Sequence, residues 1–369
     1  MKILFVTDLY PIGEENIAKA LFYFVQEWQK QGHEVEIVRS NFILNTLLRN
    51  RKIIEEKIYY EQNTKIYNLN FHTPFWFNVY NKLPKDFSLK NYDVIISHMP
   101  CGSLMANKLL KRDKIKYICG VHCSDIVVLK DFKYLFFKNK LSKAYKNADK
   151  IAARSPILQS EIEEIIPETK NKTFVAYSGI KEEFIEKDYE AKTFDKNEIK
   201  ISTVASLIKR KNIDIILKAL SMLSINFHLT IMGDGKERKN LEKLTKKLSI
   251  EKKVTFTGKI KREEVITNLK NSDIFILLSD NETFGLSYLE AMTSNNIVIA
   301  KRNDGIDGII KHEENGFLID KTHNELKKCL EKIFTLEDCK IEQIRANSIE
   351  TVKNLSMKNS AENYIKNIQ

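Results

Sequence analysis

The chain has 369 residues, of which 43% are hydrophobic and 30% are charged, and its formal net charge is +11 at neutral pH. This length exceeds that of a typical single domain, and the composition predicts a soluble, globular protein with two hydrophobic cores. No apolar stretch approaches the roughly 20 residues that cross a bilayer, which excludes a membrane-spanning helix from the prediction.

The amino-terminal run Met1–Val6 is apolar but too short for a signal peptide, and Asp8 ends it. Without an export signal, the five cysteines, an odd number, are expected to be free thiols in the reducing cytoplasm. Cys119 and Cys123 flank His122, but no second paired cluster accompanies them, so we expect no zinc site.

Short apolar runs alternate with helix-length segments, which predicts an α/β protein with parallel sheets and crossover helices. The expected strands are 3–6, 35–39, 94–97, 115–119, 150–153 and 173–176 in the first half, then 201–205, 228–232, 254–257, 274–278 and 297–300 in the second. A helix is expected over 17–31, because Gly32 suits the position after a helix end. The charged stretch 181–200 has little pattern and predicts an interdomain connection.

Two such halves raise the question of a dinucleotide enzyme. The loop after the first strand contains a single glycine, Gly13, where the fingerprint G-x-G-x-x-G needs three. The sequence therefore argues against an NAD-dependent oxidoreductase.

Positive charge is concentrated in the segment Lys130–Lys150, which holds seven lysines against two aspartates. Aromatic residues are interleaved with these charges: Phe132, Tyr134, Phe136, Phe137 and Tyr145. This pattern is typical of contact with an anionic membrane surface, and a core helix with a solvated lysine face explains it equally well. No nucleic-acid-binding module accompanies the charge, so no nucleic acid partner is expected.

Two loops of the second half have the composition of an anion site. Residues 206–211 follow a strand and would bring helix-start amides and Lys211 to an anion, although a solvated basic turn is the alternative. Glu282 and Glu290, separated by seven residues, stand at a strand-to-helix junction, where α/β proteins bind ligands. Two solvated acids at a helix start are the simpler explanation. Gly285 favours a ligand, because glycine permits the turn that frees amides for an anion.

The order of the motifs resembles that of the retaining nucleotide-sugar glycosyltransferases of family 4, over most of the chain. That family has a phosphate clamp R-x4-K, then G-D-G, F-x-G and E-x7-E, which correspond here to 206–211, 233–235, 256–258 and 282–290. The resemblance implies a GT-B fold, in which two Rossmann-like domains face each other across a cleft.

The resemblance also implies the division into domains. The acceptor domain is expected over 1–185 and the donor domain over 186–350. Residues 351–369, with a helix over Met357–Ile368, are expected to cross back to the first domain.

Individual roles follow from the same resemblance. Lys211 matches the clamp lysine, but Ser206 stands where arginine is usual and offers only a neutral hydrogen bond. Glu282 is expected beside the transferred sugar, and Glu290 is expected to accept the ribose hydroxyls. Backbone groups of Lys259 and Ile260 are expected to hold the nucleobase. The other implied donor-binding residues are Gly13, Gly233, Thr283, Phe284, Gly285 and Leu286.

His122 ends a strand of the first half and resembles the histidine of the family motif H-G-x-D, which faces the transferred sugar. Cys123 replaces the glycine of that motif, so the loop is expected to be displaced. The implied catalytic residues are His122, Lys211 and Glu282. His98, at the end of another strand, is assigned an acceptor-side or structural role.

The resemblance implies a metal-independent, retaining, hexosyl-type transferase. Its co-substrate is a nucleotide-diphosphate sugar, a UDP-sugar by preference, with no further cofactor. The acceptor is a glycan or lipid-linked glycan in cell-surface polysaccharide or glycoconjugate synthesis. Because Ser206 and Cys123 depart from the pattern, an inactive GT-B partner or nucleotide-binding subunit stays open, as does a GT-B sugar epimerase. We expect a cytoplasmic protein that reaches the inner face of the membrane through Lys130–Lys150.

Overall fold

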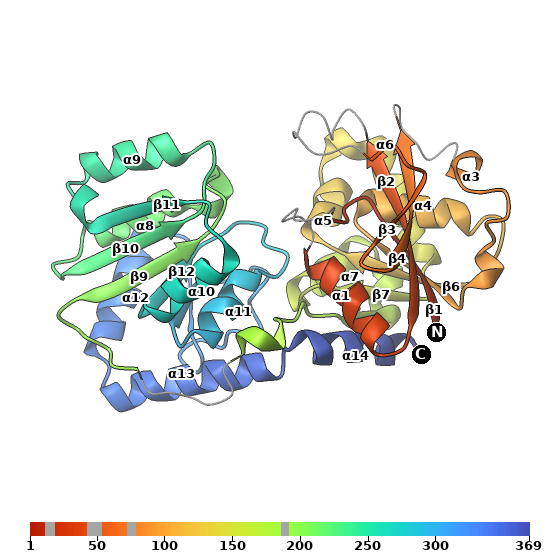
Figure 1. The fold of residues 1–369 in the computed structure, drawn as a ribbon. Helices are drawn as coiled ribbons and strands as arrows, with labels where there is room; N and C mark the ends of the chain where they lie inside the picture. Colours follow the sequence, from red (N-terminus) through yellow and green to blue (C-terminus); the bar gives the residue numbers. More distant parts are fainter. Residues whose placement is uncertain (12–18, 43–53, 72–78, 186–191) are drawn as a thin grey trace. The chain divides into compact units, whose positions relative to one another are not determined.

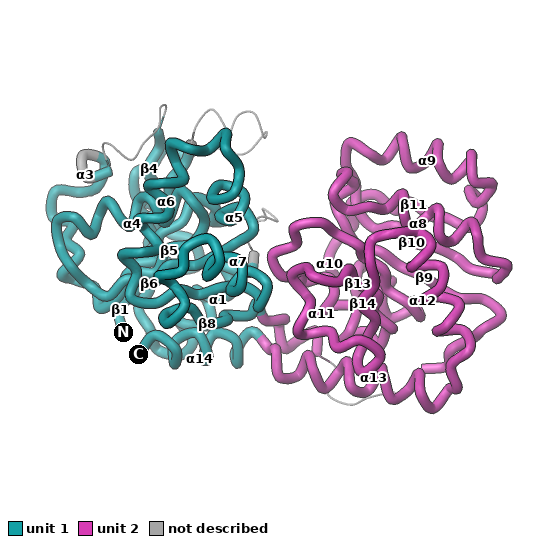
Figure 2. Tube along the Cα trace, turned by 180° about the vertical axis from the view of Figure 1, so that it is seen from behind, with its two compact units in different colours: residues 1–178, 357–369 teal, residues 179–356 magenta. Residues whose placement is uncertain are grey.

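The computed structural model describes residues 1–11, 19–42, 54–71, 79–185 and 192–369. It consists of two compact units, unit 1 with residues 1–178 and 357–369 and unit 2 with residues 179–356 (Figures 1 and 2). The boundaries at 178 and 356 differ from those expected at 185 and 350. Each unit is an α/β structure with a largely parallel sheet, so the predicted class is confirmed.

Within the described residues, the sheet of unit 1 has eight strands in the order β3-β4-β2-β1-β5-β6-β7-β8. The strands are β1 (Lys2–Thr7), β2 (Glu34–Phe42), β3 (Ile58–Glu61), β4 (Thr64–Phe71), β5 (Val94–His98), β6 (Lys116–Val121), β7 (Lys150–Ala153) and β8 (Thr173–Val175). The α-helices are α1 (Lys19–Lys30), α3 (Val79–Lys82), α4 (Pro100–Leu109), α5 (Cys123–Lys130), α6 (Leu135–Asn147), α7 (Pro156–Ile165) and α14 (Met357–Ile368).

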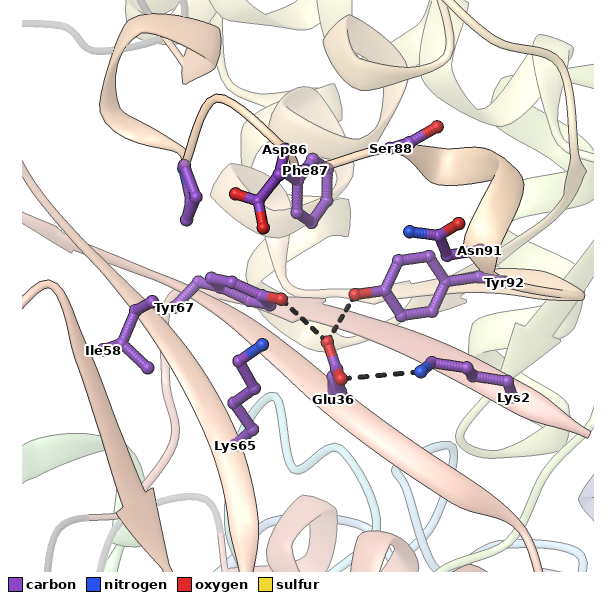
Figure 3. Close-up of a pocket in the computed structure, with 11 residues that line it drawn as sticks. Lys2, Glu36, Ile58, Lys65, Tyr67, Asp86, Phe87, Ser88, Asn91 and Tyr92 are labelled. Atoms are coloured by element: carbon purple, nitrogen blue, oxygen red, sulfur yellow. Dashed lines mark hydrogen bonds and ion pairs between the residues drawn. The ribbon is translucent and has the colours of Figure 1, made fainter.

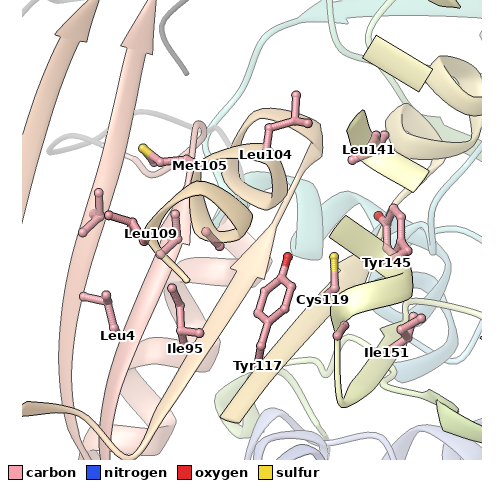
Figure 4. Packing of buried hydrophobic residues seen from close by; sticks show 14 of the residues in the cluster. Leu4, Ile95, Leu104, Met105, Leu109, Tyr117, Cys119, Leu141, Tyr145 and Ile151 are labelled. Atoms are coloured by element: carbon pink, nitrogen blue, oxygen red, sulfur yellow. The ribbon is translucent and has the colours of Figure 1, made fainter. Parts of the chain in front are cut away.

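The central strands of unit 1 are buried on both faces. In β1, Leu4 and Val6 belong to one hydrophobic cluster, whereas Ile3 and Phe5 belong to the other. Figure 4 shows the first cluster, in which Leu109 of α4 lies near Leu4. A strand covered on both faces is apolar at every position, which explains why these strands are recognisable in the sequence.

The hairpin of β3 and β4 is absent from the sequence prediction. These two strands pair antiparallel, whereas the other neighbours in this sheet pair parallel. Glu61 pairs with Thr64, and the two loop residues, Gln62 and Asn63, have φ angles of 44° and 65°. Two-residue hairpin loops are usually recognised by Asn-Gly or Asp-Gly, and Gln-Asn gives no such signal.

Helix α14 completes the core of unit 1, although it follows unit 2 in the chain. The rings of Tyr364 and Trp28 lie 5.2 Å apart between centroids, and Trp28 Nε1 donates a hydrogen bond to the carbonyl oxygen of Ala361 at 3.2 Å. Ile365 and Ile368 are buried beside them in the same cluster. Helix α14 thus packs against α1, and unit 1 is built from two separate stretches of chain.

The described part of unit 2 contains a six-stranded sheet in the order β11-β10-β9-β12-β13-β14, with parallel neighbours throughout. The strands are β9 (Ile199–Val204), β10 (Phe227–Met232), β11 (Val254–Gly258), β12 (Ile274–Leu277), β13 (Ile297–Lys301) and β14 (Phe317–Ile319). The α-helices are α8 (Ile213–Leu220), α9 (Arg238–Lys247), α10 (Arg262–Lys270), α11 (Leu286–Thr293), α12 (His323–Thr335) and α13 (Asp338–Lys353). Because the strands are parallel, their carboxyl ends lie on the same side and form one edge of the sheet. The loops that follow β9, β10, β11 and β12 leave from this edge.

Candidate functional site

The loops after β9 and β12 meet through an ion pair between Lys211 and Glu282. Lys211 Nζ donates to Glu282 Oε2, and the lysine is buried at the end of a short 3-10 helix, Lys209–Lys211. Arg210 approaches the same carboxylate, with its Nη1 atom 3.8 Å from Glu282 Oε2. The backbone also joins the loops, because Asp280 N–H donates to Arg210 O at 2.7 Å. Two predicted catalytic residues are therefore in direct contact.

Asp280 and Asp304 hold this loop in place together with two lysines. Lys301 Nζ lies 2.8 Å from Asp280 and 3.2 Å from Asp304, and Lys321 Nζ lies 2.5 Å from Asp280. Burial opposes ionisation of Asp280, but hydrogen bonds from Lys301, Lys321 and Asn212 outweigh it and lower its pKa to about 2. This carboxylate is therefore ionised at neutral pH.

Gly285 makes the turn that leads into α11. Its φ angle is +83°, and a Cβ at this position would lie 2.5 Å from Cδ2 of Tyr288, so both the backbone and the space require glycine. Phe284 is buried just before it, and Leu286 is the first residue of the helix. The amide groups at the start of a helix carry partial positive charge. Because α11 begins only four residues after Glu282, these amides follow closely on that glutamate in the sequence.

Glu290 projects from α11 and forms an ion pair with Arg262, the first residue of α10. The Glu290 side chain is 8% exposed, and the Arg262 guanidinium stacks on Phe184 at 4.8 Å from the ring centroid. Arg262 follows closely on Lys259 and Ile260, the residues expected at the nucleobase. The ion pair therefore links the second glutamate of the motif to the loop after β11.

The loops after β9, β10 and β11 also touch one another. Gly233 N–H donates to Gly258 O at 2.8 Å, and a Cβ at residue 233 would lie 2.0 Å from the carbonyl oxygen of Ala205. Glycine at 233 thus lets the loop of the predicted phosphate clamp pass close to the strand end. Ser206 follows Ala205 directly and is exposed at this edge.

Most of the predicted donor residues are thus placed along one edge of the unit 2 sheet. Gly13 lies outside the described residues. The side chains that hold the acids were not predicted from the sequence: Arg262, Asp280, Lys301, Asp304 and Lys321. None of them stands at a fixed distance from a recognised motif, except Asp280, which lies two residues before Glu282.

In unit 1, His122 and His98 end the adjacent strands β6 and β5 and form a buried pair. His98 Nδ1 and His122 Nε2 are 2.8 Å apart, and His98 Nε2 is 3.2 Å from the hydroxyl of Tyr364 on α14. Burial, and then the charge of Arg154, lower the pKa of His122 to about 3. The same causes, with His122, place the pKa of His98 well below its usual value. Both imidazoles are therefore neutral at physiological pH.

Asp125, one turn after His122, is fully buried, and its Oδ2 accepts a hydrogen bond from His122 N–H at 3.0 Å. Burial raises its pKa from 3.8 to about 7. The folded protein therefore keeps this proton at a pH at which the unfolded chain has lost it. Stability should fall as pH rises from about 4 to about 7, because the unfolded state is the stronger acid in this window.

Asp125→Asn is accordingly expected to match the wild-type midpoint of thermal unfolding at pH 4 and to exceed it by about 5 °C at pH 8. The amide resembles the protonated acid and can still accept from His122 N–H. Thermal scans across this pH range provide the measurement, with Asp338→Asn, whose side chain is 84% exposed, as the control. Identical pH profiles for Asp125→Asn and wild type would show that the carboxyl group ionises normally in the folded state.

A second polar cluster lies near the amino ends of the strands in the unit 1 sheet, away from the histidine pair. It lines a pocket of about 250 Å³ (Figure 3). Glu36 Oε2 accepts hydrogen bonds from the hydroxyls of Tyr67 at 2.9 Å and Tyr92 at 2.5 Å, and its Oε1 lies 3.7 Å from Lys2 Nζ. Burial opposes ionisation of Glu36, but the two hydroxyls and the charges of Lys65 and Lys2 lower its pKa. These groups satisfy one another and join the starts of neighbouring strands.

Among the described residues, no three His, Cys, Asp or Glu side chains gather in a way that could hold a metal ion. None of the five cysteines forms a disulfide bond in the part of the chain that the structure describes. Over the same described ranges, no helix has the length and apolar character needed to cross a bilayer.

Family profiles described as "Glycosyltransferase Family 4" and "Glycosyl transferases group 1" match residues 17–184 and 184–353. An uncharacterized glycosyltransferase of Methanocaldococcus jannaschii is 30% identical over 75% of this chain and 74% of the relative. The chain belongs to the family 4 type of glycosyltransferases. The N-acetyl-alpha-D-glucosaminyl L-malate synthase of Bacillus anthracis is also similar to this glycosyltransferase, with 27% identity over 78% of this chain and 76% of the relative.

Among solved structures, Anabaena HepE in complex with UDP has a TM-score of 0.77 to this glycosyltransferase at 17% identity, with 99% of both chains covered. The expected GT-B fold is thereby confirmed. Glycosyl transfer in general develops negative charge on the leaving group and positive charge on the sugar. The edge of the unit 2 sheet offers a lysine, two carboxylates and a helix start for this chemistry.

Proposed function

We propose that this protein is a retaining glycosyltransferase that moves a hexosyl group from a nucleoside diphosphate sugar to a glycan or lipid-linked glycan. The observation that carries the proposal is the contact between Lys211 and Glu282, in the loop that leads into α11. It combines a cation for a departing diphosphate with a carboxylate for a sugar that becomes positively charged. Because the loop is held by Asp280 and Asp304, these charges are oriented before a donor arrives.

Lys211 and the amide groups at the start of α11 bind the diphosphate in this proposal. Ser206 supplies only a hydroxyl where the family has an arginine, and we assign the second positive charge to Arg210. Two contacts support this assignment. Arg210 Nη1 lies 3.8 Å from the carboxylate that Lys211 binds, and it donates to Asp280 O at 3.2 Å, which holds the guanidinium at the loop.

The rest of the donor is assigned along the same edge of the sheet. Glu282 and the backbone of 283–286 bind the sugar hydroxyls, and Glu290 accepts the two ribose hydroxyls. Backbone groups of Lys259 and Ile260 hold the base. The contact of Glu290 with Arg262, at the start of the helix after this loop, supports assigning ribose and base to neighbouring positions.

In the proposed reaction, the bond between the sugar C1 and the β-phosphate oxygen breaks while the acceptor oxygen bonds to C1 on the same face. The departing phosphate takes the proton of the acceptor hydroxyl, and no covalent enzyme intermediate forms. Lys211 stabilises the charge that develops on the phosphate. His122 is proposed as a neutral hydrogen-bonding partner of the transferred sugar, since burial and Arg154 suppress its protonation.

A UDP-sugar is the proposed donor. Anabaena HepE, which shares the fold, was solved with UDP and with UDP-glucose, and this supports a uridine nucleotide. Cations of the protein take the role that a divalent metal has in other transferases, so we propose metal-independent transfer. A cytoplasmic role in cell-surface polysaccharide or glycoconjugate synthesis completes the proposal.

A panel of nucleotides and nucleotide sugars tests it. UDP and one UDP-sugar are expected to raise the midpoint of thermal unfolding by several degrees at about 100 times their dissociation constants, because a ligand of the folded state stabilises by mass action. The stabilising UDP-sugar should then be hydrolysed slowly in the absence of acceptor. Proton NMR at early times should show a released sugar with the anomeric configuration of the donor.

Addition of EDTA should leave the hydrolysis rate unchanged. Release of the opposite anomer would exclude retention, and a rate abolished by EDTA would exclude metal independence. Binding of UDP-sugars without turnover, even with acceptor mixtures, would identify an inactive nucleotide-binding protein instead.

A further inference from the structure

Exposed hydrophobic side chains gather in one short stretch of unit 1. Phe132 is 85% exposed, Phe136 61% and Leu135 52%. They lie in the 3-10 helix Phe132–Tyr134 and in the first turn of α6. Large apolar side chains this exposed and this close together usually mark a contact surface.

Lysines lie among these side chains in the same two helices. Lys133 and Lys143 are exposed, Lys138 and Lys140 are half-buried, and Lys140 Nζ lies 3.9 Å from the centroid of the Phe136 ring. We call the stretch Phe132–Lys143 the basic aromatic surface; it contains no acidic residue, and Asp131, just before it, pairs with Lys133 at 2.6 Å.

The opposite face of α6 is buried in the core of unit 1, through Leu141, Ala144 and Tyr145. The helix is therefore fixed to the unit by one face and presents the other outward. The core-helix explanation accounts for the buried face of α6, and the other face is exposed, basic and aromatic. A surface that is already held rigidly loses little conformational entropy when it docks.

We infer that the basic aromatic surface docks unit 1 onto an anionic lipid bilayer. Phe132, Leu135 and Phe136 enter the interfacial region, and the surrounding lysines pair with anionic headgroups. The charge selects a negative partner, and the apolar side chains select one with an accessible hydrocarbon region. A single-stranded nucleic acid would use ring faces for stacking, whereas Leu135 has none and the Phe136 ring already carries Lys140.

The docking surface is independent of the transfer reaction, so it is tested by binding alone. The full chain is mixed with vesicles of phosphatidylcholine or of phosphatidylcholine with phosphatidylglycerol at low salt, and the sedimented fraction is measured. We expect binding to the anionic vesicles, weak binding to the neutral ones, and loss of binding at high salt. No sedimentation with anionic vesicles at low salt would overturn the inference.

Removal of the apolar part gives the first variant. The double substitution Phe132→Ser and Phe136→Ser is expected to weaken vesicle binding at least about tenfold, because two exposed rings no longer enter the bilayer. Tyr60→Ser removes a 67% exposed ring from β3, outside the surface, and should bind like wild type. Equal losses in both variants would show that the surface is not the docking site.

Removal of the charge gives the second variant, with Lys138, Lys140 and Lys143 changed to glutamine. Binding to anionic vesicles should again fall at least about tenfold. The control changes three exposed lysines of α9 in unit 2 to glutamine: Lys239, Lys243 and Lys247. Equal losses here would indicate nonspecific attraction by net charge and contradict the inference.

Thermal unfolding and UDP-induced stabilisation of every variant report whether the fold and the donor site persist. Both should stay at wild-type values, since the substituted phenylalanines are exposed and the donor residues belong to unit 2. A single-stranded oligonucleotide is offered in parallel. Tight binding that these variants abolish, together with unchanged vesicle binding, would assign the surface to nucleic acid.

Discussion

Lys211→Ala is expected to lower glycosyl transfer, or donor hydrolysis, by about 10²- to 10³-fold, the effect of removing one preorganised group from a developing anion. Lys211 is buried at the end of its turn and its ammonium contacts Glu282, so a mobile surface lysine cannot take its place. The substitution also leaves the Glu282 carboxylate without its closest cation. That negative charge then faces a negatively charged leaving group.

Nucleotide binding separates this effect from a general loss of structure. Lys211→Ala should weaken the binding of UDP, measured by calorimetry, but not that of UMP, because the missing cation is assigned to the diphosphate. The control is Lys209→Ala, which removes an exposed lysine from the same turn and should change turnover little. Near-normal turnover of Lys211→Ala would refute the catalytic assignment. An equal loss of turnover in Lys209→Ala would show that the loss follows from the lower positive charge of the turn and not from Lys211 itself.

Glu290→Gln is expected to raise the dissociation constant of UDP by about 10- to 100-fold, since hydrogen bonds to a charged acceptor contribute about 1.5–3 kcal/mol. The side chain is nearly isosteric, so the loss should come from charge and not from a cavity. Calorimetry with UDP gives the constant, and circular dichroism checks the fold. Glu264→Gln, an exposed position on α10, serves as the control and should bind UDP normally.

A comparison of UDP with 2′-deoxy-UDP tests whether Glu290 acts on the ribose. Wild type should bind the deoxy nucleotide more weakly, whereas Glu290→Gln should bind both with similar affinity, because the partner of the missing hydroxyl is already weakened. Arg262→Gln keeps the carboxylate and should still distinguish the two nucleotides. If Glu290→Gln retained the full preference for UDP, the glutamate would be a structural partner of Arg262 only.

The sequence predicted the fold well wherever burial on both faces makes a strand apolar throughout. Strand β12, within the expected 274–278, is an example, since all four of its residues are buried. The prediction failed for strands that are short or that include buried polar residues. Strand β4 includes the buried polar residues Thr64 and Asn68, so it does not read as an apolar run, and the three residues of β14 are too few to form a recognisable pattern.

The candidate site shows the same division. The glycines and glutamates were visible because backbone geometry and ligand chemistry impose residue types at fixed spacing, as at Gly285 and Glu290. The partners that orient these acids come from other loops. Their distance along the chain from the glutamates follows no fixed pattern, so Arg262 and Asp304 could not be predicted. His98 was noticed but not joined to His122, since the 2.8 Å contact depends on the pairing of β5 with β6.

Helix α14 has a consequence for biosynthesis. A nascent chain that has emerged through β8 already carries every strand of the first sheet, yet it lacks Tyr364, Ile365 and Ile368, which seal the face against Trp28. Unit 2, by contrast, is complete in a single continuous stretch. Unit 1 therefore cannot reach its final packing until all of unit 2 has been synthesised, and until then the apolar face that α14 covers is open to aggregation.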